Sequence, residues 1–274
     1  MTARSRLIRT LVPVAGAALA CAAFALAPGA GAAPARLAAP AVAPAAHTLA
    51  NNAATIGLAN ARFGNTHARA AQPARLGGKY NINGGNWSGY AAQGSGYSSV
   101  TSNWTEPTVT CNSTNDLMAP WVGIDGYGSS SVEQTGVATD CSSGRAVYQA
   151  WYEMYPAAPV YYTNTVSGGD HITATVTRSG TTYTLVVSDT TKGWTKTTTK
   201  SASAANSSAE VIIESPTAAY PRFGSVSFTN AKVNGGSLSA VNPVALDASN
   251  NYGYEDRTSA ISGGTSFSIS YLRE

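Results

Sequence analysis

The chain has 274 residues, of which 11% are charged and 43% hydrophobic, against about 25% charged residues in an ordinary soluble domain. This balance excludes a charge-rich disordered chain, a coiled coil and a generic nucleic-acid-binding protein. The formal charge of +3 is unevenly distributed: residues 1–78 carry seven arginines and no acidic residue, whereas residues 79–274 carry 10 basic and 14 acidic residues. All 14 tyrosines and all five tryptophans lie beyond residue 79. The chain therefore divides into a basic, Ala/Pro-rich leader and a mildly acidic domain rich in aromatic residues.

The first 32 residues have the features of a secretory signal peptide. Three arginines within the first nine residues precede an apolar run from Leu11 to Ala27, and Ala30-Gly31-Ala32 is a typical cleavage sequence. The run is rich in alanine and ends at Pro28-Gly29, which favours cleavage over a membrane anchor. We therefore expect a secreted, extracellular protein that has no membrane attachment once residues 1–32 are removed.

Residues 33–78 consist mainly of Ala, Pro, Asn and Arg, with almost no aromatic residues. Such a segment cannot bury enough apolar surface to fold alone, so we expect it to be largely disordered. A basic segment between a signal peptide and a folded domain is typical of a propeptide, and the alternative is a plain linker. The folded domain is expected to span residues 79–274.

Two cysteines remain after removal of the signal peptide, Cys111 and Cys141. An even number of cysteines in an exported protein predicts a disulfide, which in the chain-entropy model contributes about 3–4 kcal/mol for a loop of this size. There is no second cysteine pair, and His171 is the only histidine of the domain. We expect no metal and no cofactor.

The domain reads as all-β. Apolar and polar residues alternate in residues 171–177, 182–187, 225–228 and 266–271, and clusters of Gly, Asn and Asp recur between such runs. No long apolar pattern with the helical period of 3.6 residues is present. Short strands with regular turn signals predict an antiparallel β-sandwich or barrel.

Several common catalytic signatures are missing from the domain. It contains no G-x-S-x-G, no H-E-x-x-H and no D-T-G or D-S-G sequence. His171 follows Gly168-Gly169-Asp170, which favours an exposed turn residue over a catalytic base. Carboxylates are the remaining candidates for catalysis.

The segment 209–214 places two glutamates in an otherwise apolar strand. In a regular strand Glu210, Ile212 and Glu214 share one face, and Val211 and Ile213 face the core. The two glutamates would lie about 13 Å apart, too far for the carboxylate pair of a retaining glycosidase, which needs about 5 Å. They would face a cleft or, in the plainer alternative, solvent.

Aromatic residues accompany acidic ones in two further segments. In residues 148–156, Trp151, Glu153 and Tyr155 share one face, which suits a groove for an extended polymer. The alternative is a half-buried strand with its tryptophan in the core. In residues 121–126 alternation places Trp121 and Asp125 on one face, and residues 131–137 read as a short strand that carries Gln134.

Six segments together resemble the glutamic peptidases, or eqolisins, in their bacterial branch. They occur in the family's order: N-W-S-G-Y (86–90), W-V-G-I-D-G (121–126), E-Q-T-G-V (133–137), Y-Q-A-W-Y-E-M-Y-P (148–156), S-A-E-V-I-I-E (208–214) and F-G-S-V-S-F-T-N (223–230). The resemblance implies a concanavalin-like or jelly-roll β-sandwich of two bent antiparallel sheets with a concave active-site face. It also implies secretion as a proenzyme and acid endopeptidase activity on protein or peptide substrates. We expect a monomer that binds no nucleic acid.

The same resemblance assigns the site residues. The catalytic pair falls on Gln134 and Glu210. The groove residues of the family fall on Trp87, Trp121, Asp125, Trp151 and Glu153. One departure concerns the position four residues after the catalytic glutamine, where fungal members have an aspartate and this chain has Ala138, with Asp140 two residues further on.

The chemistry of the pair suits peptide hydrolysis. Glu210 can take a proton from water and later give it to the leaving amine, and the neutral amide of Gln134 can donate to the developing oxyanion. A carboxyl group with an unperturbed pKa of about 4.3 fits activity in acid. The rival interpretations are a secreted carbohydrate-binding sandwich, which would use Trp87, Trp121 and Trp151 as a stacking platform, and a catalytically inactive scaffold.

The leader and the domain carry net charges of opposite sign. Four arginines remain in the leader after removal of the signal peptide, and the domain carries a net charge of −4. We expect the leader to lie across the acidic groove near neutral pH and to release as the carboxylates take up protons between about pH 5 and pH 3.

Overall fold

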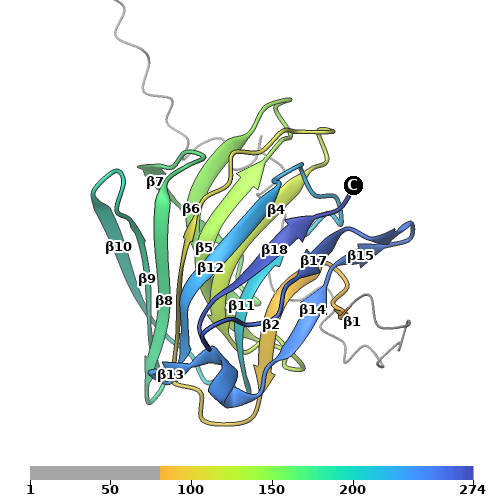
Figure 1. The fold of residues 1–274 in the computed structure, drawn as a ribbon. Helices are drawn as coiled ribbons and strands as arrows, with labels where there is room; N and C mark the ends of the chain where they lie inside the picture. Colours follow the sequence, from red (N-terminus) through yellow and green to blue (C-terminus); the bar gives the residue numbers. More distant parts are fainter. Residues whose placement is uncertain (1–80, 274) are drawn as a thin grey trace, which may run out of the picture. The chain divides into compact units, whose positions relative to one another are not determined.

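The computed structural model describes residues 81–273, so the predicted signal peptide and most of the leader lie outside the described residues. Two eight-stranded sheets face each other, as Figure 1 shows, and the predicted β-sandwich is confirmed. All pairings within these sheets are antiparallel except that of β1 with β14. In residues 81–273 we find no apolar helix of a length that would cross a bilayer.

The first sheet is built around the segments that the sequence singled out. Its strands, in spatial order, are β1 (Ile82–Asn83), β14 (Val244–Asp247), β2 (Trp87–Gln93), β11 (Ser208–Glu214), β4 (Leu117–Ile124), β5 (Val132–Asp140), β6 (Val147–Tyr155) and β7 (Val160–Thr165).

The second sheet contains the four runs of alternating residues. Its strands, in spatial order, are β10 (Trp194–Ser201), β9 (Thr182–Asp189), β8 (His171–Ser179), β3 (Ser99–Thr105), β12 (Ser225–Val233), β18 (Phe267–Tyr271) and β17 (Asp256–Thr258), with β13 (Gly236–Ser237) paired to β12. A separate ribbon pairs β15 (Ser249–Asn250) with β16 (Gly253–Tyr254). Within residues 81–273 the one helical segment is a 3₁₀ turn at Leu238–Val241.

The main core lies between the two sheets and follows the period of two residues that strands impose. Val211 and Ile213 of β11 face it, as predicted, together with Val122 of β4. The strands β4, β5 and β11 are buried along their whole length, so both of their faces are covered. A second apolar cluster, here called the outer cluster, lies on the face of the first sheet directed away from the second sheet: Trp87, Ala91, Leu117, Ala119, Trp121, Tyr127, Val132, Ala138, Trp151, Ile212 and Leu246.

The disulfide between Cys111 and Cys141 is present, with the two Cα atoms 5.7 Å apart. This distance lies within the range of about 4.4–6.8 Å that a disulfide requires. The bridge joins the segment before β4 to the residue that follows β5, and the backbone N–H of Cys141 also donates to the Asp116 carbonyl at 3.0 Å. The strand that carries Gln134 is longer than predicted, because it continues past residue 137 to Asp140.

Candidate active site

One row of side chains crosses the middle of the first sheet. The register pairs Glu210 of β11 with Gly123 of β4, Gly123 with Gln134 of β5, and Gln134 with Glu153 of β6. Residues in direct register on neighbouring strands point to the same face of a sheet. The structure therefore brings together three of the predicted site residues, on the face that carries the outer cluster.

Gly123 separates the two residues predicted to be catalytic. Neighbouring strands lie about 5 Å apart, so the Cα atoms of Glu210 and Gln134 are about 10 Å apart. Gly123, the residue between them, has no side chain beyond a hydrogen atom. A β-carbon at position 123 would lie 2.8 Å from a ring carbon of Trp121 and 3.2 Å from Cβ of Gln134. The glycine therefore leaves room for the Trp121 ring to pack between Glu210 and Gln134, a role that its motif did not reveal.

The amide of Gln134 is oriented by the neighbouring strand. Its Nε2 donates a hydrogen bond of 2.7 Å to Oε2 of Glu153, and both side chains are fully buried. A charged acceptor strengthens such a bond and fixes which end of the amide faces it. Glu153 therefore contacts the predicted catalytic glutamine directly.

Glu210 is fully buried, and its Oε1 accepts a hydrogen bond of 3.3 Å from the backbone N–H of Tyr127. Burial raises the pKa of Glu210 well above its usual range, and the charges of Asp125 and Glu133 raise it further. The Ser208 hydroxyl and the Tyr127 N–H oppose this rise in the pKa because they stabilise the ionised form. The alternative that residue 210 faces solvent is therefore wrong.

Glu214, four residues along β11, also faces no solvent. Its Oε2 accepts from the indole N–H of Trp121 at 3.1 Å, and its Oε1 accepts from Nδ2 of Asn86 at 3.0 Å. The rings of Trp87 and Trp121 pack edge to face, with centroids 5.1 Å apart and an interplanar angle of 79°. Glu214 therefore orients the aromatic cluster instead of forming part of the row of Glu210 and Gln134.

Trp151 of β6 lies in register with Gly136, which in turn pairs with Trp121. Trp151 belongs to the outer cluster, and Tyr155 packs against that cluster. The prediction that Trp151, Glu153 and Tyr155 share one face is therefore confirmed, and Ala150 lies in the core between the sheets.

Asp125 does not follow the alternation that predicted its place. The strand β4 ends at Ile124, and Asp125 has a left-handed backbone with φ of 66°. Its carboxylate accepts hydrogen bonds from the backbone N–H groups of Asn206 at 2.7 Å and Ser207 at 2.8 Å, and from Oγ of Ser207 at 3.0 Å. The side chain therefore holds the segment that leads into β11, and the shared face with Trp121 is a wrong prediction.

The position occupied by aspartate in fungal members carries no carboxyl group here. Ala138 is fully buried in the outer cluster, in register with Gln149. Asp140 lies at the end of β5, where its two oxygens accept from the backbone N–H and the hydroxyl of Ser142 at 2.8 and 2.9 Å. Asp140 therefore stabilises the turn that follows β5.

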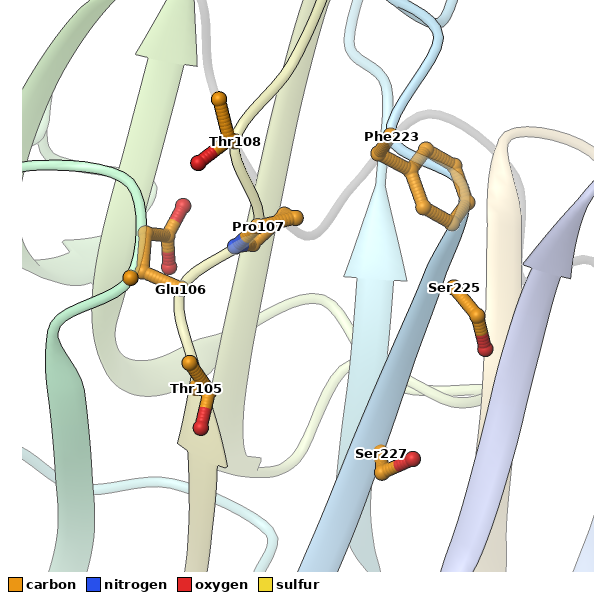
Figure 2. Close-up of a pocket in the computed structure, with 8 residues that line it drawn as sticks. Thr105, Glu106, Pro107, Thr108, Phe223, Ser225 and Ser227 are labelled. Carbon is orange, nitrogen blue, oxygen red and sulfur yellow. The ribbon is translucent and has the colours of Figure 1, made fainter.

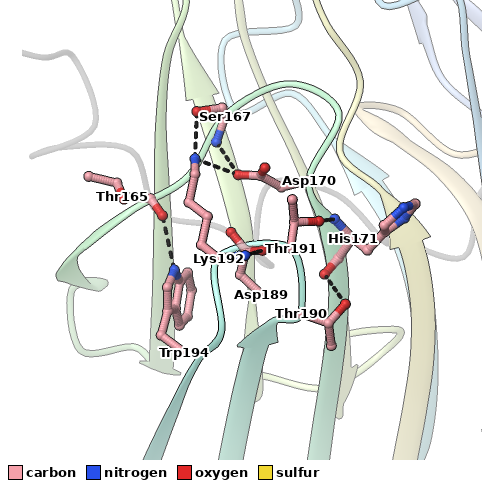
Figure 3. Close-up of polar contacts among 9 residues, drawn as sticks. All are labelled: Thr165, Ser167, Asp170, His171, Asp189, Thr190, Thr191, Lys192 and Trp194. Carbon is pink, nitrogen blue, oxygen red and sulfur yellow. Dashed lines mark hydrogen bonds and ion pairs between the residues drawn. The ribbon is translucent and has the colours of Figure 1, made fainter.

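Figure 3 shows that His171 belongs to a structural cluster at one end of the second sheet. Lys192 forms an ion pair of 2.7 Å with Asp170 and donates to Oγ of Ser167, while the backbone N–H of His171 donates to Oγ1 of Thr191. The histidine side chain is exposed, as predicted.

A hollow of about 400 Å³ lies on the second sheet, apart from this row (Figure 2). It is lined by Thr105, Glu106, Pro107, Thr108, Gly169, Phe223, Ser225 and Ser227. The carboxyl group of Glu106 is bound by the Trp104 indole N–H at 2.9 Å and the Thr139 hydroxyl at 3.1 Å. Burial raises its pKa to about 7, and we assign the hollow no role. Within residues 81–273 no group of three or more His, Cys, Asp and Glu residues is placed to hold a metal ion.

Comparisons with known proteins match this fold and these segments. Aspergillopepsin-2 of Aspergillus niger is 32% identical over 182 residues, which cover 55% of this chain and 64% of that protein, so the match spans less than two thirds of the relative's length. The crystal structure of scytalido-glutamic peptidase with a transition state analog inhibitor aligns with a TM-score of 0.61 and 27% identity over 69% of this chain and 98% of the other. SCP-B, described as a member of the eqolisin family in a complex with the tripeptide Ala-Ile-His, aligns with a TM-score of 0.57, 26% identity and the same coverage.

A family model covers nearly the whole described region. The model of the Peptidase A4 family matches residues 85–271, a span that includes every segment on which the resemblance was based. Two solved glutamic peptidases have the same β-sandwich fold. On the family-model match, the chain belongs to the Peptidase A4 family, the eqolisins or glutamic peptidases.

Proposed function

We propose that this protein is a secreted acid endopeptidase that hydrolyses peptide bonds with Glu210 and Gln134. The observation that carries the proposal is the row in which these two side chains share one face, separated only by Gly123. A scissile peptide group bound between these two side chains would have the carboxyl group on one side and the amide on the other. The named relatives are glutamic peptidases, which supports the same chemistry here.

In the first step the ionised Glu210 takes a proton from water, and the water oxygen attacks the carbonyl carbon of the substrate. The electrons of the C=O double bond move to the carbonyl oxygen, which receives a hydrogen bond from Gln134. In the second step the protonated Glu210 gives its proton to the amide nitrogen, and the C–N bond breaks to release an amine and a carboxylic acid. The raised pKa of Glu210 makes its ionised form a stronger base but a less populated one in acid, and the Ser208 hydroxyl and the Tyr127 N–H oppose this loss by stabilising the ionised form.

Gln134 can serve as the oxyanion donor because its hydrogen bond to Glu153 uses only one of the two N–H groups of its amide. One N–H group points to Glu153, and the second N–H group of the same nitrogen can serve the substrate. A donor of this kind is worth about 3–4 kcal/mol in the transition state.

The geometry of the tryptophans argues against the rival carbohydrate-binding function. Stacking on a sugar needs exposed rings in a common plane, whereas Trp87 and Trp121 meet at 79° and are fully buried. The indole N–H of Trp121 also donates a hydrogen bond to Glu214. We propose that these side chains, along with Trp151, support the peptide-binding face from within the buried outer cluster and do not stack on the substrate.

The test is hydrolysis of denatured casein at acid pH by the purified protein and its variants. We expect Glu210→Gln and Gln134→Ala each to remove most of the activity with an unchanged circular dichroism spectrum, and Glu214→Gln to have a smaller effect. Glu106→Gln is the matched control, because it changes another fully buried glutamate, which follows β3 and lies outside the row of Glu210 and Gln134. Wild-type turnover by Glu210→Gln would refute the mechanism, and binding to insoluble polysaccharide without casein hydrolysis would favour the rival function.

A further inference from the structure

A second hollow, of about 370 Å³, lies at one end of the first sheet. It is formed by the residues before β2, the segment after β11 and the ribbon of β15 and β16. Its lining consists of three small residues, Gly, Pro and Ala, and five neutral polar ones: Asn86, Thr217, Ser249, Asn250 and Asn251. The proposed peptidase mechanism uses none of these side chains.

The hollow lies on the face of the sheet that carries the proposed catalytic pair. Nδ2 of Asn86 donates to Oε1 of Glu214 at 3.0 Å. Glu214 shares a face of β11 with Glu210 and with Ile212, which belongs to the outer cluster. Four residues of a strand span about 13 Å, so the hollow begins about 13 Å from Glu210 along β11. An extended peptide covers the same distance with four residues, so a bound substrate can reach the hollow.

The wall formed by Asn250 is held in place by hydrogen bonds. Oδ1 of Asn250 accepts from the backbone N–H of Tyr252 at 2.9 Å and from Nη2 of Arg273 at 3.0 Å. Its Nδ2 donates to Oε1 of Glu255, a fully buried carboxyl group, at 3.0 Å. Binding therefore does not need to order this wall, which lowers the entropic cost of taking up a ligand.

The opposite wall is also fixed. The backbone N–H of Ser215 donates to the Asn86 carbonyl at 3.0 Å, and the backbone N–H of Ala218 donates to the Ser215 carbonyl at 3.0 Å. These bonds tie residues 216–218 to the segment before β2. Thr217 is exposed between them, with its hydroxyl 3.2 Å from Oγ of Ser215.

Asn251 offers the hydrogen-bonding groups that a ligand would use. The residue is exposed, and among the described residues its side chain makes no hydrogen bond. An asparagine amide has two N–H donors and a carbonyl acceptor, so it matches a second amide group in both directions. None of the lining residues carries a charge, so the lining offers no counter-ion to a charged side chain.

We propose that this hollow, here called the distal subsite, binds a glutamine or asparagine side chain of the substrate, four or five residues from the scissile bond. The substrate amide pairs with the amide of Asn251. A leucine in its place would leave the Asn251 amide without this partner, and a lysine would find no carboxylate in the lining. The role in cleavage rests on the proposed function, whereas peptide binding can be measured without cleavage.

The test uses variants of one casein-derived peptide that is cleaved at a single bond and extends six residues on each side of it. Glutamine, leucine or lysine is placed at the fourth and fifth positions on either side. On one side, glutamine should raise kcat/KM over leucine by about threefold to tenfold, the range for one neutral hydrogen-bonded pair. The gain should appear mainly in KM, because the contact is remote from the reacting atoms.

Two substitutions of Asn251 separate recognition from a structural role. Asn251→Ala should reduce the ratio of kcat/KM for the glutamine and leucine peptides to about 1, since it removes the pairing amide. Asn251→Asp, assayed near pH 5 where an exposed aspartate is ionised, should raise kcat/KM for the lysine peptide by about twofold to fivefold. Asn115→Ala is the control: it removes another exposed asparagine, in the turn before β4 and outside the hollow, and should keep the wild-type ratio.

The inference fails if glutamine and leucine peptides are cleaved equally well at all four positions, or if Asn251→Ala keeps the wild-type ratio. If the wild type cleaves no peptide, the proposed function fails, and calorimetric titration with the same peptides still decides on the subsite. Tighter binding of the glutamine peptide to the wild type than to Asn251→Ala supports the distal subsite, and equal binding refutes it.

Discussion

The amide of Gln134 and the carboxylate of Glu153 form a hydrogen bond of 2.7 Å between neighbouring strands, in the row that also contains Glu210. The family resemblance places Glu153 among the groove residues, and its contact in the structure is with Gln134, the proposed oxyanion donor. A residue that orients a donor affects the chemical step, whereas a residue that only binds substrate affects KM.

We therefore predict that Glu153→Leu lowers kcat by about tenfold or more and changes KM little, because the amide of Gln134 loses its anchor. Glu153→Gln keeps a carbonyl oxygen that can accept from Gln134 and should retain more of kcat than the leucine variant. Steady-state kinetics on one peptide substrate measure both parameters. A rise in KM with an unchanged kcat would instead assign Glu153 to substrate binding.

Gly123 supplies a second prediction. A methyl group at this position would lie 2.8 Å from the ring of Trp121 and 3.2 Å from Cβ of Gln134, so it would displace side chains in the row of Glu210 and Gln134. Gly123→Ala should lower the free energy of unfolding by about 1–3 kcal/mol and remove most of the peptidase activity. Urea denaturation and casein hydrolysis measure the two effects.

The matched control for this variant is Gly236→Ala, since the nearest atom to a β-carbon there is the Val233 carbonyl oxygen at an ordinary 3.6 Å. The control should leave activity unchanged. Full activity of Gly123→Ala would show that the close packing of Trp121 on Gly123 is not needed for catalysis.

Alternation along single strands predicted the fold and the faces, because it depends only on local sequence. It placed Val211 and Ile213 in the core and Trp151 and Glu153 on one face, and both placements are confirmed. The resemblance, and not the spacing, paired Gln134 with Glu210.

Alternation along single strands cannot predict the register between strands that are far apart in the sequence. The row that joins Glu210 to Glu153 exists because β11 lies beside β4, and Glu210 is in register with Gly123, 87 residues earlier in the chain. Gly123 has no side chain to signal its role. Asp125 was misplaced because its left-handed backbone ends the alternation. The sequence does not predict the contact between Tyr127 and Glu210, because its donor is a backbone N–H, which every residue except proline has.

Ser208 should set the acid limb of the pH profile. Its hydroxyl lowers the pKa of Glu210 by stabilising the ionised form, against the rise caused by burial. Glu210 must be ionised to accept a proton from water, so Ser208→Ala should shift the acid limb of kcat/KM upward by about one pH unit. The control is Ser188→Ala, which removes a hydroxyl that contacts Thr195 on the second sheet. An unshifted acid limb would show that Ser208 does not act on the ionisation that limits the reaction.

The last prediction concerns the leader, whose residues lie outside the described part of the chain. Its four arginines, Arg36, Arg62, Arg69 and Arg75, stay charged at all relevant pH values, and the domain carries a net charge of −4. Each exposed ion pair is worth only about 0–1 kcal/mol, but the covalent tether supplies a high effective concentration. The leader is therefore expected to block the groove near neutral pH and to be released on acidification.

The structure changes the expected pH of that release. Burial raises the pKa of Glu210, so its charge is lost at a higher pH than that of an ordinary glutamate, and its share of the attraction fades earlier as the pH falls. Replacing the four arginines by glutamine should therefore give a precursor that is active at a higher pH or is processed faster, as followed by gel electrophoresis and casein hydrolysis during stepwise acidification. Replacing them by lysine keeps the charge and is the control. If the glutamine precursor matures at the rate and pH of the wild type, the leader is a passive linker, and the assignment of Glu210 and Gln134 is unaffected.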